Sequence, residues 1–404
     1  MEPPERFELP TLGFEDQYSI HWATEAIGAT ERTRTSTPVK GLAPQASVAT
    51  ITPQSRKHIY CMNPQTYCPL IDHQIMIDYH GAVSPCCHVQ LADSLTDFPE
   101  KISSLRNEMA SGSRMKACTR CWQDEDNNLE SLRQVSLDLY KKNLIDQNLL
   151  SLDIRINNTC NLACTMCSSH ASTLWAKIEG SNTATSINDE ALDKLVSMSD
   201  SLIKVSMQGG EVFYGDAYAK FLERLPNKSQ ITLEFFTNAV SVDLNLIAKW
   251  KSEFKHVMMI ASVDGVEEVF EDLRWPATWS KLQRKLDKVY PLLLNAMSFN
   301  YTLQNSNLLC LKRLVDWRNE RYPRSGITFS ELHWPEPLHY TNVSDADRAA
   351  GVELIDQIKT NFAHEKSRLA GLKDLLQASV TDPAALARKE QYLARVSQLR
   401  QRKV

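Results

Sequence analysis

The sequence lacks the features that would place the protein in a membrane, outside the cell or on nucleic acid. It contains no run of about 18 apolar residues, so no transmembrane helix is expected. Its N-terminus is acidic and contains proline, without the basic and then apolar order of a secretory signal. The formal net charge of -4 gives no general attraction to nucleic acid or anionic lipid. We therefore expect a cytoplasmic protein with no membrane or nucleic-acid partner.

The cysteines are concentrated in one part of the chain. There are 10 in total, and all except Cys310 lie between Cys61 and Cys167. Because a reducing cytoplasm disfavours structural disulfides, clustered cysteines in such a protein indicate metal or redox chemistry. Cys310 is expected to be an ordinary buried thiol.

The chain is expected to divide into an irregular arm, a cysteine-rich module, an α/β region and a helical extension, which cover residues 1–55, 56–145, 146–344 and 345–404. In the module, apolar residues alternate before Gly81, as in a strand that enters a turn, and a helix is expected within residues 127–144. The extension ends in a basic run, which we expect to be a solvated helix face: Arg388, Lys389, Arg395, Arg400, Arg402 and Lys403.

Strands and helical segments alternate through the α/β region. The expected strands begin at Leu152, Leu202, Ile231, Val257, Met297 and Gly326. Successive βα units of this kind favour a parallel sheet, either open or rolled into a barrel. The catalytic groups of such sheets gather at the carboxyl ends of the strands, so the segments that follow the strands are where a site is expected.

The segment CNLACTMC lies directly after the first of these strands and carries Cys160, Cys164 and Cys167. A loop this short keeps three thiolates close enough to bind one inorganic cluster. A [4Fe–4S] cluster takes four ligands, so three cysteines leave one iron open to a small molecule. The alternative is a zinc site completed by His170.

The spacing CxxxCxxC after the first strand of a βα array resembles the signature of the radical S-adenosylmethionine superfamily. The next strand ends in QGGEVF, where Gly209, Gly210 and Glu211 resemble the glycine–glycine–glutamate motif of that superfamily. Glycine lets the backbone approach a ligand closely. By the resemblance, Glu211 binds the amino group of the methionine moiety. A zinc site predicts nothing at the second strand end, so the two motifs together favour the cluster.

The ends of the third and fourth strands, TNA and SVDG, fit the same resemblance. It implies that Asn238 and Ser262 contact S-adenosylmethionine, Ser262 through the ribose, and that Arg274 binds the methionine carboxylate. The planar fork of an arginine can bond both oxygens of a carboxylate. Taken as residues alone, Asn238 and Ser262 are equally consistent with turn and capping roles.

The N-terminal cysteines form a second set. The spacing from Gly81 to Cys86 and the later C-x-x-C resemble the half-size form, called twitch, of the SPASM auxiliary-cluster domain, here placed before the barrel. The resemblance implies a second [4Fe–4S] cluster, and such a closed ligand set suits electron transfer. Its ligands would be Cys68, Cys86, Cys118 and Cys121.

Two alternatives stay open for this second set. Cys87 can replace Cys86 as a ligand, because consecutive strand residues face opposite ways and only one of the two can face the site. Four thiolates also suit a structural zinc ion, so zinc remains an alternative to the cluster. Cys61 is not expected to be a ligand.

The expected fold is therefore α/β, a partial (β/α)6 TIM-like barrel with a small N-terminal iron–sulfur module and a helical C-terminal extension. The resemblance implies an oxidoreductase that cleaves S-adenosylmethionine reductively and modifies a substrate, with an external electron donor such as flavodoxin or ferredoxin. The substrate is a peptide or protein side chain, or alternatively a small molecule such as a nucleoside or sugar. A non-catalytic metal-binding interaction protein is the alternative from a different class.

Overall fold

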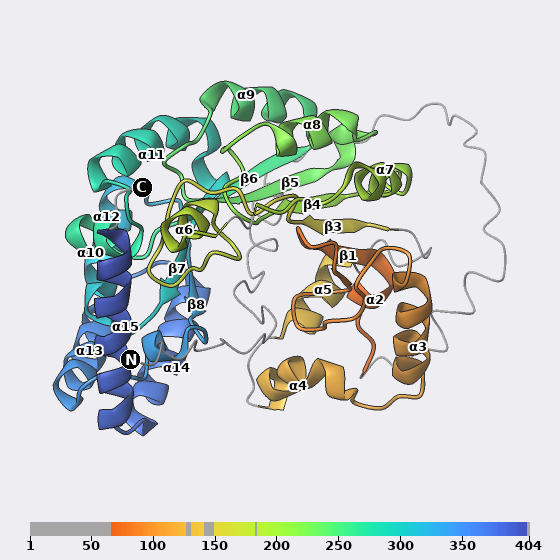
Figure 1. Cartoon of the computed structure of the whole chain (residues 1–404). Helices are drawn as coiled ribbons and strands as arrows, with labels where there is room; N and C mark the ends of the chain where they lie inside the picture. The colour runs from red at the N-terminus through yellow and green to blue at the C-terminus, as the bar shows by residue number, and fades with distance from the viewer. Residues whose placement is uncertain (1–65, 127–130, 141–148, 182–183, 402–404) are drawn as a thin grey trace, which may run out of the picture.

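One sheet of eight strands organises the computed structural model, which describes residues 66–126, 131–140, 149–181 and 184–401 (Figure 1). The strand order is β2-β1-β3-β4-β5-β6-β7-β8. The strands are β1 (Gln74–Ile77), β2 (Val83–Ser84), β3 (Ser151–Ile154), β4 (Lys204–Met207), β5 (Thr232–Thr237), β6 (His256–Ser262), β7 (Met297–Leu303) and β8 (Ile327–Glu331). All neighbouring pairs are parallel except β1 and β2.

The strands predicted from sequence are confirmed as β3 to β8, each starting within two residues of the expected position. The helices between them are α6 (Thr173–Glu179), α7 (Asp189–Ser197), α8 (Ala217–Arg224), α9 (Leu244–Glu253), α10 (Glu267–Leu273), α11 (Trp279–Leu293) and α12 (Leu311–Arg321). From β3 to β8, consecutive strands are also neighbours in the sheet. The right-handed crossover that is the rule for parallel strands puts the connecting helices of such a sheet on one face. This is the winding of a partial TIM-like barrel.

The two faces of this sheet differ in chemistry, because side chains alternate along each strand. The face that meets the helices is apolar: the ring of Phe235 lies 5.5 Å from that of Trp250 in α9, and Phe299 lies 5.3 Å from Trp317 in α12. The opposite, inner face carries polar side chains in register on β3, β4 and β5: Asp153, Ser206 and Glu234. A few polar side chains gathered on one face of a sheet are suited to orienting a ligand.

The cysteine-rich stretch contributes to the same sheet. Strand β1 pairs in parallel with β3, and Gly81 makes the turn to β2 with φ of +87°. Helices α2 (Leu70–His73), α3 (Phe98–Ala110), α4 (Thr119–Asp126) and α5 (Leu132–Tyr140) surround this strand pair (Figure 1). The expected strand and helix are thus confirmed. Residues 1–55 and Cys61 lie outside the described residues.

The C-terminal extension is helical as expected, with α13 (Asp345–Gln357), α14 (Ala363–Ala378) and α15 (Pro383–Arg400). A fully buried ion pair fixes α14 to α12, because both guanidinium ends of Arg318 lie 2.7 Å from the Glu365 carboxylate. Glu365 also accepts the backbone N–H of Ile327 at the start of β8. The extension is therefore attached to the last strand of the sheet.

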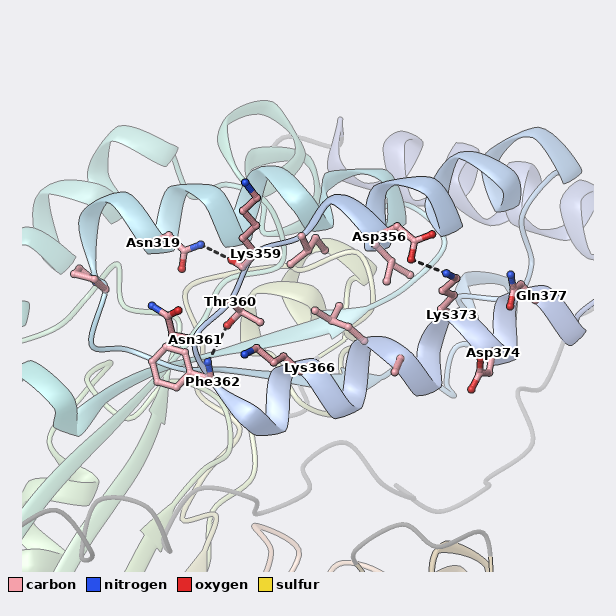
Figure 2. A pocket seen from close by; sticks show the side chains of 15 residues that line it. Asn319, Asp356, Lys359, Thr360, Asn361, Phe362, Lys366, Lys373, Asp374 and Gln377 are labelled. Atoms are coloured by element: carbon pink, nitrogen blue, oxygen red, sulfur yellow. Dashed lines mark hydrogen bonds and ion pairs between the residues drawn. The ribbon is translucent and has the colours of Figure 1, made fainter.

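A groove of about 980 Å³ runs along α14 beside α13 and the end of α12 (Figure 2). Its lining includes Lys359, Lys366 and Lys373, and Lys373 pairs with Asp356 at 2.6 Å. None of the site residues predicted from sequence lines it.

No helix in the described part of the chain is both long and apolar enough to cross a membrane.

Candidate cofactor site

The three-cysteine loop follows β3 at the carboxyl edge of the sheet, where sequence analysis placed it. Its backbone is tied to the segment after α10: Ala163 N–H donates to Trp275 O and Thr165 N–H to Leu273 O, both at 2.8 Å. Cys164 and Cys167 lie within one turn, closed by a 3.0 Å bond from Cys167 N–H to Cys164 O. The loop is therefore a fixed element rather than a free connection.

The three thiols share one buried environment. Burial raises the pKa of Cys160, Cys164 and Cys167, and the nearby Cys164 sulfur raises it further for the other two, to about 12 for Cys167. The backbone N–H of Leu162 donates to the Cys160 sulfur and favours its thiolate form. Thiols in such a place ionise when a bound metal replaces their protons. Among the described residues, no three His, Cys, Asp or Glu side chains are placed to hold one metal ion.

The glycine pair after β4 packs on the backbone that leads into this loop. A Cβ on Gly210 would lie 2.2 Å from Thr159 O and 2.6 Å from Asn158 C, while Gly209 has φ of +111°. Hydrogen bonds join the two segments: Gly210 N–H donates to Asn157 O, and Glu211 N–H donates to Thr159 O at 2.7 Å. Sequence analysis assigned these glycines to close approach of a ligand. In the structure they allow close approach of the cysteine loop itself.

Glu211 is the buried anion of the site. It is 1% exposed, and its Oε1 accepts Thr237 Oγ1 at 2.6 Å and Phe213 N–H at 3.1 Å, while Oε2 accepts Asn238 N–H at 2.7 Å. Burial raises the pKa of Glu211, and these three bonds oppose the rise. A carboxylate has about four acceptor positions, so one on Oε2 remains for a further donor.

Asn238 joins the same cluster of strand ends. Its side-chain Nδ2 donates to Asn161 Oδ1 in the cysteine loop at 2.9 Å, and its Oδ1 accepts Val240 N–H. The side chain therefore links the β5 end to the cysteine loop and also makes the turn that the residue type alone allows. Ser262, at the end of β6, is buried on the inner face of the sheet.

Arg274 lies against both the cysteine loop and Asp264. Its Nη2 is 2.6 Å from Asp264 Oδ2, and its Nη1 is 4.0 Å from the Cys164 sulfur. Burial raises the pKa of Asp264, and Arg274 opposes that rise. One edge of the guanidinium is thus engaged by a protein carboxylate, an engagement that the resemblance did not predict, and the other edge faces Cys164.

Helix α15 binds the cysteine loop from the outside. Arg400 donates to Ala163 O at 2.6 Å, to Thr165 Oγ1 at 3.0 Å and to Asp272 O at 2.8 Å. Tyr392 Oη donates to Thr165 O at 2.9 Å. The expectation of a solvated basic face is therefore wrong for Arg400, whereas Arg388 and Arg395 are exposed and Lys389 is half-buried. Arg402 and Lys403 lie outside the described residues. Helical periodicity shows that a face exists but not which backbone carbonyls it meets.

The N-terminal cysteines come together from separate segments. Cys68 precedes α2, Cys86 follows β2, and Cys118 and Cys121 lie one turn apart at the start of α4. Burial raises the pKa of all four. Cys121 and Cys118 raise the pKa of Cys68 further, and Cys87, Cys68 and Cys121 raise that of Cys86, so the four predicted ligands and the alternative Cys87 are electrostatic neighbours.

Cys86 and Cys87 differ in their surroundings. Cys86 is 8% exposed, and the N–H of His88 donates to its sulfur, as the N–H of Leu70 donates to that of Cys68. Cys87 is half-buried, and its sulfur lies 3.9 Å from His88 Nδ1. The matching N–H···S arrangement at Cys68 and Cys86 is typical of thiolates that bind a cluster or zinc.

Comparisons with known proteins add little. No protein-family model matches the chain, and no curated protein matches it. Among solved structures, native anSMEcpe with bound AdoMet aligns at 19% identity over 52% of this chain and 60% of that one, with a TM-score of 0.40. Streptococcus suis SuiB bound to S-adenosylmethionine aligns at 14% identity over 71% and 60%, with a TM-score of 0.36. This chain thus spans about 60% of the length of both neighbours. Similarity of this degree does not assign a function, which has to come from the residues of the site.

Proposed function

We propose that this chain is a radical S-adenosylmethionine enzyme whose cofactor site is the cysteine loop after β3. The observation that carries the proposal is the contact of the two motifs. The Gly209–Gly210–Glu211 turn packs on the backbone just before Cys160, and the Glu211 carboxylate is close enough to raise the pKa of that thiol. A zinc site at these cysteines would need no such partner.

A [4Fe–4S] cluster is wider than a single metal ion, so three thiols that are not placed to share one ion can still be its ligands, and the proposal assigns the cluster and its S-adenosylmethionine to these residues. Cys160, Cys164 and Cys167 would hold the cluster, which when bound supplies the electron that splits S-adenosylmethionine into methionine and a 5′-deoxyadenosyl radical. The free position on Glu211 Oε2 suits the amino group of the methionine moiety. Arg274, which lies against Cys164, is the group proposed to bind its carboxylate.

In the proposal, the residues at the remaining strand ends position the bound S-adenosylmethionine and do not take part in the reaction. Asn238 links the Glu211 cradle to the cysteine loop, and in the proposal it also borders the bound S-adenosylmethionine. Ser262 is the group assigned to the ribose hydroxyls, since it ends β6 on the inner face. Both residues are buried, and the Asn238 side chain is also hydrogen-bonded, which reduces the reorganisation that ligand binding requires.

In the same proposal, Cys68, Cys86, Cys118 and Cys121 hold an auxiliary cluster, with Cys86 preferred to Cys87 because its sulfur accepts a backbone N–H as that of Cys68 does. A cytoplasmic donor such as flavodoxin or ferredoxin would supply electrons, and a peptide or protein side chain is the proposed substrate, with a small molecule as the alternative. The inner face of the sheet, which is polar, is where the substrate would lie.

Iron analysis and product analysis together test the proposal. After anaerobic reconstitution, the protein should bind about eight irons per chain, as two [4Fe–4S] clusters require. With dithionite and S-adenosylmethionine it should release 5′-deoxyadenosine. Zinc bound in place of iron, with no 5′-deoxyadenosine formed, would contradict it.

The Cys118→Ala/Cys121→Ala variant separates the two sites. We expect it to lose about four irons per chain, because two ligands of one closed [4Fe–4S] set are removed, and to retain reductive cleavage at the other site. The measurement is iron content beside 5′-deoxyadenosine yield. Cys310→Ala is the matched control, since Cys310 is a buried thiol far from both sets in sequence, and it should keep all the iron. Full iron in the double variant would show that the N-terminal ligand set is wrong.

Arg400 offers a test of how α15 affects the cluster. Its guanidinium lowers the pKa of Cys164, so it places positive charge near the proposed cluster. Removing that charge in Arg400→Ala disfavours the more negative reduced state and should lower the midpoint potential, on the order of tens of millivolts. Arg400→Lys keeps the charge and should restore most of the potential.

The control for Arg400 is Arg388→Ala on the same helix. Arg388 pairs with Glu336 at 3.0 Å on the surface, away from the cysteine loop. Its potential should equal that of the unmodified protein, measured by redox titration with electron paramagnetic resonance. A potential unchanged in Arg400→Ala would contradict the role assigned to α15.

A further inference from the structure

Two buried oxygens on the inner face of the sheet have no hydrogen-bond partner among the described residues: Asp153 Oδ1 and Gln208 Oε1. Each residue is only 3% exposed. Gln208 Nε2 donates to Asp153 Oδ2 at 2.7 Å, so the two side chains are already joined and each presents its other oxygen. Buried acceptors normally have donors, and an unmatched pair in one place points to a missing one.

The pair lies next to the proposed cofactor site. Asp153 is in β3, the strand that leads into the cysteine loop, and Gln208 directly precedes Gly209. Met76, which lies opposite Asp153 on this face, is half-buried, whereas the apolar residues in register on the other face are almost fully buried. The inner face beside β1 is therefore less completely covered than the outer face, although both free oxygens are shielded from solvent.

The charged groups around the pair do not supply the missing donors. Lys204 pairs with Glu234 at 3.1 Å, and Glu234 also accepts Ser206 Oγ at 3.2 Å. Arg155, two residues beyond Asp153, makes no hydrogen bond to either free oxygen. Burial raises the pKa of Asp153 to about 6, with Glu234 raising it and Arg155 and Lys204 lowering it, so the carboxylate is ionised at neutral pH.

We propose that Asp153 and Gln208 form a substrate-binding subsite for a planar group with paired N–H donors, a guanidinium or a primary amide. Two acceptor oxygens on side chains that one hydrogen bond joins match a group that presents two N–H bonds together, as a guanidinium or carboxamide does. The inference deepens the proposed function, because it gives the chemical class of the substrate of that same site. The group is part of a peptide side chain or of a free small molecule.

The subsite can be tested without any cluster. Methionine methyl groups labelled with ¹³C in the full chain report from both faces: Met76 and Met258 on the inner face, and Met207 and Met259 on the outer face. Methylguanidinium and propionamide are the probes, and hexamethylguanidinium and N,N-dimethylpropionamide are their counterparts without N–H donors. We expect the first two to shift the inner-face signals saturably, and their counterparts to leave all four signals unchanged.

Variants assign the shifts to the pair. Asp153→Asn and, independently, Gln208→Met should weaken methylguanidinium binding at least tenfold, while Ser206→Ala, a neighbour on the same face whose hydroxyl serves Glu234, should bind as the unmodified chain does. The outer-face methyl signals show whether each variant is folded. Equal binding of the methylated counterparts, unchanged affinity in both variants, or no shift at all would show that the pair is not a binding subsite. The two free oxygens would then be hydrogen-bonded to water.

A second binding experiment, with the blocked tripeptides Ala-Arg-Ala and Ala-Gln-Ala, shows whether the bound guanidinium or amide belongs to a peptide side chain or to a free molecule. Tighter binding of these tripeptides than of the small probes supports a peptide side chain, and binding of the small probes alone supports a free molecule. Because the experiment needs no iron, it tests the subsite independently of the proposed radical chemistry. A chain that cleaves S-adenosylmethionine but does not bind the probes would contradict the subsite alone.

Discussion

The Cys164→Ala variant is expected to release no detectable 5′-deoxyadenosine. Cys164 is the central cysteine of the loop and is 8% exposed. Its sulfur raises the pKa of both Cys160 and Cys167, so it lies close to each. With two ligands left, the site cannot hold a cluster with a single open iron, so cleavage has no electron source. The N-terminal set is untouched, and about four irons per chain should remain.

Its matched control is Cys310→Ala, a buried cysteine that belongs to neither ligand set. This control should retain about eight irons, as two complete clusters require, and normal 5′-deoxyadenosine release. Anaerobic turnover with dithionite, followed by chromatography of the nucleosides, gives the comparison. Cleavage that persists in Cys164→Ala would contradict the assignment of the loop.

The Gly210→Ala variant should lose cleavage activity by about 100-fold or more, although every cysteine and Glu211 are retained. Its added Cβ would lie 2.2 Å from Thr159 O, and the atoms it meets are backbone, so no side-chain rotation relieves the contact. The loop before Cys160 has to move by about 1 Å, and displacements of that size in a catalytic arrangement cost about 100-fold in rate. We expect stability to fall by about 1–3 kcal/mol, as for overpacking elsewhere.

The control for this substitution is Gly371→Ala in α14, where an added Cβ meets no atom within 4 Å. That variant should be stabilised by about 0.5–1 kcal/mol, because alanine is the better helix former, and its activity should be unchanged. Thermal unfolding and 5′-deoxyadenosine yield are measured on both. Normal cleavage in Gly210→Ala would show that the glycine–loop contact does not matter to the site.

Local periodicity was sufficient to predict most of the α/β region. Buried strands such as β7, and the helix α11 with its apolar positions three and four residues apart, carry their pattern within a few residues of sequence. Because parallel strands direct their carboxyl ends to one edge, the position of the cysteine loop followed from the strand that precedes it.

Contacts between distant segments were not predictable in this way. The residues of β1 do not indicate that it pairs with β3, and the basic run does not indicate that Arg400 donates a hydrogen bond to Ala163 O. Asp264 was visible within SVDG and Thr237 within TNA, but their partners, Arg274 and Glu211, lie on other elements. A sequence pattern gives the face that a side chain occupies, whereas its partner depends on how whole elements pack.

The most direct test of the central claim measures whether S-adenosylmethionine binds at the cysteine loop. The reduced Cys118→Ala/Cys121→Ala protein would contain only the proposed cluster at Cys160, Cys164 and Cys167. Its paramagnetic resonance spectrum should change when S-adenosylmethionine is added, and a label of ¹⁵N on the methionine amino group should give a resolved coupling that is lost in Cys164→Ala. A spectrum unchanged by S-adenosylmethionine, or a coupling that survives in Cys164→Ala, would contradict the assignment.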